Sequence, residues 1–474
     1  MAKNTEIELK LLVDKDALKR LLQLDCVTGA IRENSCQKRK MVSSYYDTED
    51  LAFKRNGIAY RVRSKGDGSY EATVKTSIKN GAGLSERLEL NLPLGIPRAK
   101  LDGFGELGLG FELTELAPNG VGKLFTVTVQ RTTYILDLQG AVVELAIDHG
   151  KIMAGKAVDK IDEIEIELLE GDKGALLKLA ADIAAQVPIF VEKRSKFVRG
   201  MALRGISVDE TPAPNKLGSG PAKGEILAAI AAHGEQLFGL KAALEENLSE
   251  KILKSLRREL LALRSLAALA GVDQCESLED TLQTVEHLRR LLGLQALWQR
   301  LLLKAGLERT SLQKKLAEAT FETMEMLRIL AADGHFTAIV FAMTSMVYQA
   351  ELGDEAVEAR VKAYLKQYQQ ELASKTAQIK GNGEDDDIAV AIEEAELLEQ
   401  QLITAENICA LARCCNVKAA VKAGEAVKKQ RRQLNKQAVL TAWRDCLTDI
   451  CEESSSKLVY REAGMILGYL LAKE

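Results

Sequence analysis

Apolar and charged residues alternate with a period of two in several short segments of the first 205 residues. Residues 5–12 read TEIELKLL, and residues 161–169 read IDEIEIELL. Such alternation sends neighbouring side chains to opposite faces of a β-strand. Gly, Asp and Asn separate the segments, which predicts strands joined by hairpins. Two stretches at 14–24 and 171–186 have helical character instead, each with an Asp near its start.

The pattern changes after residue 205. Residues 206–224 carry three of the seven prolines and predict a linker. From 225 to 474, apolar residues recur at helical spacing and no proline occurs, which predicts packed helical bundles. KGNGEDDD at 380–387 predicts a loop between two bundles. The expected fold class is α+β: a small β-rich domain at 1–205, a linker, and an all-α domain at 225–474.

Composition excludes several classes of protein. A chain of 474 residues is too long for one ordinary hydrophobic core. The sequence contains no run of 18 or more apolar residues, so no membrane-spanning helix is predicted. The eight cysteines show no C-x-x-C spacing and there are only four histidines, so we expect a cytoplasmic protein with free thiols and little soft-metal chemistry. A net charge of −4 argues against general nucleic-acid binding.

Alternation gathers charged side chains on one face of each predicted strand. These faces carry Glu6, Glu8 and Lys10; Arg61, Arg63 and Lys65; Glu71, Thr73 and Lys75; Arg87 and Glu89; Glu144 and Asp148; and Glu163, Glu165 and Glu167. For any single strand, a solvent-exposed polar face explains the pattern. Acid-rich and base-rich strands recur in one small domain, however, which favours convergence inside a closed sheet. Buried charges must be paired or bind ions. A polyanion with Mg²⁺ or Mn²⁺ meets that requirement.

These residues also carry a family resemblance. EIELK at 6–10 matches the E-x-E-x-K signature of the CYTH, or triphosphate tunnel metalloenzyme, family. The resemblance continues in order with YYDTEDLAFKRNGIAYRVR, ATVKT, ERLEL, QRTTYIL, VELAIDHG, EIEIELLEGD and KRSKFVRG, and covers about residues 5–200. It implies an eight-stranded antiparallel tunnel, flanked by helices, with an acidic metal-binding patch and basic phosphate clamps.

The resemblance assigns roles residue by residue. The metal-binding carboxylates are expected to be Glu6, Glu8, Glu144, Asp148, Glu165 and Glu167. The phosphate-binding groups are expected to be Lys10, Arg61, Arg63, Lys75, Arg87, Arg131 and Lys196. The reaction centre would hold Glu6, Glu8, Lys10, Lys75 and Asp148. Glu163 shares a face with Glu165 and Glu167, so it can replace Glu167 in the metal site. By alternation, His149 faces away from Asp148.

The helical half resembles a CHAD domain fused to a CYTH domain, as in bacterial inorganic triphosphatases. EKILKSLRRELLALRSL resembles the CHAD helix H-x-x-R-x-x-x-R-R, but Glu250 replaces the histidine, Leu253 replaces the first arginine, and only Arg257 and Arg258 match. DIAVAIEEAELLEQQL, at the second such helix, is acidic. From residue 225 onward there are 31 Lys and Arg against 37 Asp and Glu, whereas polyanion binding favours the reverse. A degenerate CHAD-like domain is therefore predicted, and the basic run at 417–437 is read as a solvated helix face.

The leading functional hypothesis is hydrolysis of inorganic triphosphate to pyrophosphate and phosphate with Mg²⁺, or possible Mn²⁺, as cofactor. The same site acting on thiamine triphosphate or nucleoside triphosphates, including cyclisation of ATP, is the second hypothesis. Such substrates need an aromatic or apolar patch at the tunnel mouth. A non-catalytic polyphosphate-binding protein ranks third, because it would need a basic helical domain. The expected partner is a small polyanion, with no nucleic acid and no membrane; the oligomeric state stays open.

Overall fold

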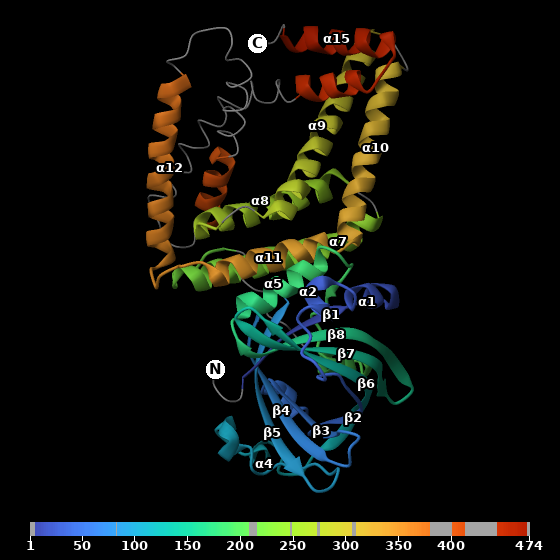
Figure 1. Cartoon of the computed structure of the whole chain (residues 1–474), viewed down its shortest axis with the longest axis vertical. Coiled ribbons are helices and arrows are strands. Elements are labelled where there is room, and N and C mark those ends of the chain that lie inside the picture. The colour runs from blue at the N-terminus through green and yellow to red at the C-terminus, as the bar shows by residue number, and fades with distance from the viewer. Residues whose placement is uncertain are drawn as a thin grey trace. The chain divides into compact units, whose positions relative to one another are not determined.

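The computed structural model describes residues 5–81, 83–207, 216–246, 249–272, 275–305, 310–379, 401–412 and 443–471. The chain divides into two compact units (Figure 1). The first comprises Met1–Ala213 and Val340–Tyr348, and the second comprises Pro214–Ile339 and Gln349–Glu474. One boundary, between Ala213 and Pro214, falls within the segment expected to be a linker, and the other two fall within residues 335–349.

The first unit is built on a closed antiparallel sheet. Its strand order is β5-β4-β3-β2-β6-β7-β8-β1, and pairing of β1 with β5 closes the ring. A two-residue strand, β9 (Phe190–Val191), also pairs with β1. The eight strands of the ring are β1 (Thr5–Leu12), β2 (Gln37–Asp47), β3 (Ile58–Ser64), β4 (Tyr70–Gly81), β5 (Leu84–Leu94), β6 (Gly122–Leu138), β7 (Ala141–Ala154) and β8 (Ala157–Gly171). The predicted eight-stranded antiparallel tunnel is confirmed.

Strand register turns the charged faces inward. Glu8 lies opposite Glu167, and Lys10 opposite Glu165. The alternate residues of β1 and β8, among them Leu9 and Ile166, are fully buried on the outer side of the sheet. Helices α1 (Lys15–Leu21), α2 (Asp25–Thr28) and α5 (Lys173–Ala184) lie along this side (Figure 1), and α5 contacts both β7 and β8. The apolar residues that would be inside an ordinary barrel therefore form its outer core.

A second outer core covers β3, β4 and β5. It is formed by the connection from β5 to β6, which contains the π-helix η1 (Gly105–Leu109) and α4 (Leu113–Leu116). Tyr60 of β3 is fully buried there, in edge contact with Phe53 of α3 (Ala52–Arg55) and with Phe104. Its hydroxyl donates to the carbonyl of Lys100 at 2.7 Å, which ties the covering connection to the strand that carries Arg61 and Arg63.

Helix α6 (Lys196–Leu203) fills one end of the barrel interior. Met201 packs with Tyr45, Phe125, Ile161 and other buried apolar residues. This cluster lies on the inner face, because Tyr45 pairs with Arg61 and Ile161 is two residues before Glu163. A Cβ added at Gly200 would lie 2.3 Å from the Phe125 ring, so the helix approaches that strand at the closest distance a glycine allows.

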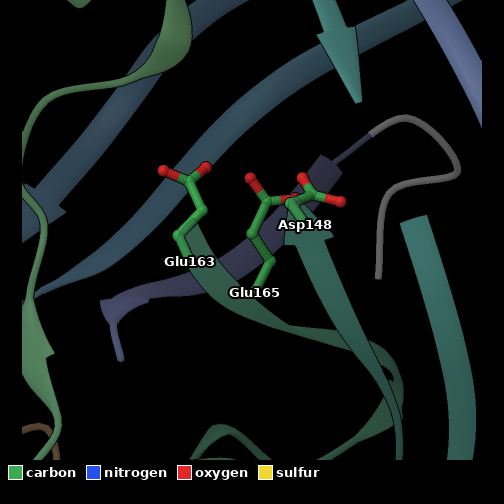
Figure 2. A group of neighbouring side chains, drawn as sticks. All are labelled: Asp148, Glu163 and Glu165. Atoms are coloured by element: carbon green, nitrogen blue, oxygen red, sulfur yellow. The ribbon is translucent and has the colours of Figure 1, made fainter. Parts of the chain in front are cut away.

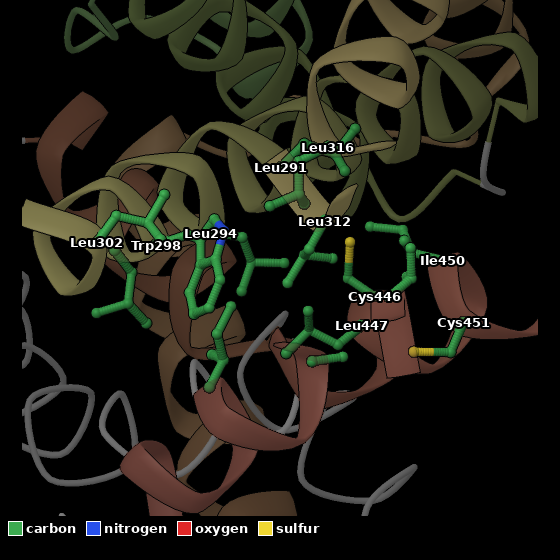
Figure 3. Close-up of a cluster of buried hydrophobic side chains, with 14 residues drawn as sticks. Leu291, Leu294, Trp298, Leu302, Leu312, Leu316, Cys446, Leu447, Ile450 and Cys451 are labelled. Carbon is green, nitrogen blue, oxygen red and sulfur yellow. The ribbon is translucent and has the colours of Figure 1, made fainter. Parts of the chain in front are cut away.

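The second unit is helical, as predicted. It contains α7 (Ala222–Glu246), α8 (Glu250–Ala270), α9 (Glu276–Ala305), α10 (Ser311–Ala332), the ends of α11 (His335–Gln349), α12 (Val357–Ile379), helical residues 401–411 and 443–452, and α15 (Lys457–Leu471). Figure 3 shows a core cluster in which Trp298 and Leu294 of α9 meet Leu312 of α10 and Leu447. The predicted loop at 380–387 and basic run at 417–437 lie outside the described residues.

No single helix among the described residues combines the length and apolar composition needed to cross a membrane. Helices α10 and α11 meet those limits only when taken together as a pair bent by 60°.

Candidate functional site

The structure brings all of the predicted site residues to the inner face of the barrel. The register places Glu6 opposite Arg87, Lys75 opposite Glu89, and Arg131 opposite Asp148. The remaining residues follow from the same register or, for Lys196, from helix α6: Glu8, Lys10, Arg61, Arg63, Glu144, Glu165 and Glu167. His149 lies on the outer face, where its Nδ1 is 2.9 Å from Asp162 Oδ1.

Glu6, Glu8 and Glu167 form the first acidic group, here called the carboxylate cluster. Lys75 Nζ donates to both Glu6 carboxylate oxygens at 2.6 Å, and Arg87 Nη1 donates to Glu8 Oε1 at 3.1 Å. Glu167 pairs with Glu8 across the strands. Burial raises the pKa of Glu6 to about 7, although Lys75 opposes the shift. Burial, together with the charges of Glu6 and Glu8, raises the pKa of Glu167 to about 8, so ionisation of this carboxyl is unfavourable in the folded protein.

Asp148, Glu163 and Glu165 form the second acidic group, here called the lysine cage. The Lys196 ammonium lies 2.8 Å from Asp148 Oδ2, 2.5 Å from Glu163 Oε1 and 2.8 Å from Glu165 Oε1. Figure 2 shows the three carboxylates, which come from β7 and β8, and their ligand oxygens all lie within 4.8 Å of one another. Glu163 thus joins Asp148 and Glu165, whereas Glu167 lies in the carboxylate cluster.

Arginines complete the neutralisation of the lysine cage. Arg131 donates to both oxygens of Asp148, at 2.7 and 2.6 Å, and also contacts Glu165. Arg199 of α6 donates to Glu163 Oε2 at 3.0 Å. Burial opposes ionisation of Glu165, but Lys196 and Arg131 hold the pKa of this carboxyl well below its usual range. Asp148 and Glu165 are therefore ionised and paired with the protein's own cations, in contrast to Glu6 and Glu167 of the carboxylate cluster.

Arg63 is the counterpart of the carboxylate cluster. Its Nε donates to Ser43 Oγ at 2.9 Å, and no carboxylate oxygen lies within 4.0 Å of it among the residues that the structure describes. Burial and the neighbouring charges of Arg61 and Arg131 lower the pKa of Arg63 to about 10. The positive charge of Arg63 is destabilised by burial and by these neighbouring arginines, so binding of an anion would stabilise it. The interior thus holds two carboxyl groups that resist ionisation, Glu6 and Glu167, and a guanidinium, Arg63, without a carboxylate partner among the described residues.

Sequence reasoning did not assign functional roles to several interior residues. Arg199 lies three residues after Lys196, so helical spacing could have placed both on one face of α6. Glu89 was placed on the charged face without a role, yet it lies 2.7 Å from Lys75 and 3.5 Å from Arg61. The sequence did not indicate a role for Tyr45 beyond its place in a motif. Its side chain points into the barrel because Tyr45 pairs with Arg61 on the neighbouring strand.

In the second unit, basic residues of α8 are paired with acids. Arg257 contacts Glu286 of α9, and Arg264 Nη1 lies 3.6 Å from Glu279 Oε2. Arg258 Nη2 lies 2.6 Å from Glu259 Oε1. These pairings agree with the acidic balance of this part of the sequence.

Comparisons with known proteins give a family match for the first unit. Residues 4–201 match the family model of the CYTH domain. An inorganic triphosphatase of Haemophilus influenzae is 30% identical over 161 residues, which are 34% of this chain and 45% of that protein. The match thus spans under half of that relative's length.

Similar solved structures include proteins resembling each half of the chain. A Hippeastrum adenylyl cyclase homologue with a dominant triphosphatase activity is 18% identical, covers 42% of this chain and 96% of its own, and gives a TM-score of 0.30. The CHAD domain of Ricinus communis is 15% identical, covers 56% of this chain and 91% of its own, and gives a TM-score of 0.39. With TM-scores this low, the two structures add no support for the fold. The fold is established by the strand register and the helices described above.

Proposed function

We propose, from the premise that this chain joins a CYTH domain at residues 4–201 to a CHAD-like helical region, that it hydrolyses inorganic triphosphate to pyrophosphate and phosphate inside the tunnel. The observation that carries the proposal is that one closed barrel holds both kinds of group on its inner face: Arg63, whose Nε donates to Ser43, and Glu6 and Glu167, whose pKa values burial raises. A triphosphate bound with a divalent cation balances both.

The residues present fit a divalent cation of the hard, oxygen-binding class. Glu6, Glu8 and Glu167 would hold it, because buried carboxylates that repel one another gain most from a shared cation. When bound, Mg²⁺ or Mn²⁺ would neutralise phosphate oxygens and lower the pKa of a coordinated water. The donor set does not distinguish Mg²⁺ from Mn²⁺.

The chain's own side chains would bind and orient the substrate. Arg63 and Arg61 would hold phosphate oxygens on the β3 side of the tunnel, since both side chains face inward beside Thr73 and Glu71. Lys75 is already held between Glu6 and Glu89, so its ammonium lies at the boundary between substrate and carboxylates. Positioning and neutralisation of charge are the main sources of acceleration in phosphoryl transfer. The closed sheet and α6 would limit the water that reaches the phosphates.

The inorganic substrate is favoured by the way the interior aromatic residues pack. Tyr45 and Phe125 stack at 4.7 Å and are only 5% and 2% exposed, with Phe197 of α6 beside them. These rings are therefore buried in the apolar cluster that packs against α6, and little of their surface is accessible for stacking with a nucleobase or a thiamine ring.

The proposal is tested by phosphate release from tripolyphosphate, ATP and thiamine triphosphate at fixed Mg²⁺. We expect fastest release from tripolyphosphate, and a large loss of kcat in Glu8→Gln. Glu49→Gln, which makes the same change at an exposed residue, is the matched control. Faster turnover of ATP or thiamine triphosphate would reassign the substrate, and equal rates for the Glu8 variant and the control would refute the metal role of this carboxylate.

A further inference from the structure

The first residues of β2 lie at one end of the tunnel, here called the mouth, and include cations that the proposed function does not use. Residues 37–40 are all exposed, whereas Met41 is 5% exposed, so the closed interior ends between Arg39 and Met41. Arg39 pairs with Arg131 of β6, which is on the inner face, and alternation places Lys40 on the outer face. Arg39 is therefore the last inward-facing cation of β2 before solvent.

The pairing of Arg39 with Arg131 is unfavourable for the fold alone, because like charges directly opposite each other on neighbouring strands lower stability. Asp148 and Glu165 neutralise Arg131. Within the described part of the chain, by contrast, no carboxylate oxygen lies within 4.0 Å of Arg39. Its Nη2 donates to Gln37 Oε1 at 2.6 Å, which is a neutral partner two residues away on the same face. The positive charge of Arg39 is thus available to an anion.

The position of Arg39 along β2 separates it from the arginines proposed to hold a triphosphate. Ser43, which accepts a hydrogen bond from Arg63, is four residues from Arg39, or about 13 Å along the strand at the usual rise per residue. Three phosphates held by Arg61 and Arg63 do not extend over that distance, whereas a longer chain would lead toward Arg39. Burial raises the pKa of Glu144, and the charge of Arg39 is one of those that oppose the shift, so Arg39 also acts on the inner wall of the tunnel.

We propose that Arg39 and Gln37 form a subsite at the mouth for the fourth phosphate of a linear inorganic polyphosphate, so that the tunnel binds chains of four or more phosphates more tightly than triphosphate. The planar guanidinium of Arg39 presents parallel donors that match two oxygens of one phosphate. The Gln37 side-chain amide accepts from Arg39 through its oxygen and keeps its NH₂ group as a donor for the same phosphate. The inference rests on the proposed function, because the first three phosphates occupy the site described there.

The test is equilibrium binding of tripolyphosphate and tetrapolyphosphate to the full-length chain, measured by isothermal titration calorimetry in EDTA. Wild type should bind tetrapolyphosphate about tenfold more tightly than tripolyphosphate, as one additional hydrogen bond to a charged group implies. Arg39→Gln should remove most of this preference and change the affinity for tripolyphosphate less than about threefold, since exposed charges are screened over such distances. Where binding in EDTA is too weak to measure, the ratio of the KM values with Mg²⁺ gives the same comparison.

Lys40→Gln is the matched control, because it removes the same charge from the neighbouring exposed position, on the outer face of the strand. The control should keep the preference for tetrapolyphosphate. Thermal unfolding tests for a structural role: relief of the repulsion from Arg131 should leave Arg39→Gln at least as stable as wild type.

Three results would overturn the inference. The first is an unchanged preference in Arg39→Gln, and the second is an equal loss of preference in Lys40→Gln. The third is a loss of ATP affinity in Arg39→Gln as large as the loss for tetrapolyphosphate, because the mouth would then receive the organic part of a substrate. Absence of tripolyphosphate hydrolysis, with the binding ratios as expected, would instead refute the proposed function alone.

Discussion

Replacing Glu167 by Gln should remove most of the loss of stability at alkaline pH that this residue causes in the metal-free protein. The pKa of Glu167 is raised to about 8 from an ordinary value of 4.5 by burial and by Glu6 and Glu8. As pH rises from 4.5 to 8 the unfolded chain ionises at this residue while the folded chain stays protonated. The folded state then binds more protons, so stability is lost across this interval.

The magnitude follows from the size of the shift. At about 1.4 kcal/mol per pKa unit the full shift corresponds to roughly 4–5 kcal/mol, and coupling to Glu6 reduces what one substitution recovers to about 2–4 kcal/mol. Glu167→Gln should therefore be more stable than wild type at pH 9 by this amount, and similar to it at pH 5. Mg²⁺ should stabilise wild type at pH 9 and have a smaller effect on the variant.

The assay must report on the first unit. Both tryptophans, Trp298 and Trp443, lie in the second unit, so intrinsic tryptophan fluorescence would follow the wrong part of the chain. Amide hydrogen exchange of peptides from β1 and β8 in EDTA, at pH 5 and pH 9 with correction for intrinsic exchange rates, measures the relevant opening free energy. The reasoning is refuted if Glu167→Gln opens more easily than wild type at pH 9.

Three further predictions follow from the packing and charge of the tunnel. Gly200→Val should lower stability by about 1–3 kcal/mol by forcing α6 off its strand, measured by thermal unfolding, whereas Gly95→Val meets open space and should change little. Arg63→Met should raise KM for tripolyphosphate at least tenfold, with Arg55→Met, an exposed arginine, as control; an unchanged KM would contradict the anion-binding role. Tyr60→Phe should cost about 1–2 kcal/mol through a lost buried hydrogen bond, and a variant as stable as wild type would show that this bond contributes nothing.

Strand alternation, which has a period of two, predicted the charged faces, and the family resemblance supplied the eight-stranded closed tunnel that they line. Once Ile7 and Leu9 face one side, Glu6 and Glu8 must face the other. A neighbouring strand with the same alternation then matches in every register that differs by two residues, whereas a shift of one residue would exchange its two faces. To predict that the charged faces point inward, only the local alternation and the expectation that the sheet closes into a barrel were required.

The division of the acids into two groups could not be predicted in the same way. Glu163, Glu165 and Glu167 are equivalent by alternation, and only the pairing of β8 with β1 and β7 distinguishes them. Placement of Lys196 in the cage depends further on how α6 enters the barrel, which is set by the close contact of Gly200 with Phe125. Both are long-range effects that no single segment encodes.

The closure of the ring through β1 has a consequence for how this protein is made. Glu8 pairs with Ser85 on one side and with Glu167 on the other, so the first strand of the ring to be synthesised lacks one neighbour until the last strand of the ring has been made. Until then β1 has a free edge, and such edges invite pairing with other chains. The residues proposed to bind the ion come together only when synthesis has passed β8, so a nascent chain stalled before that point would have no working centre.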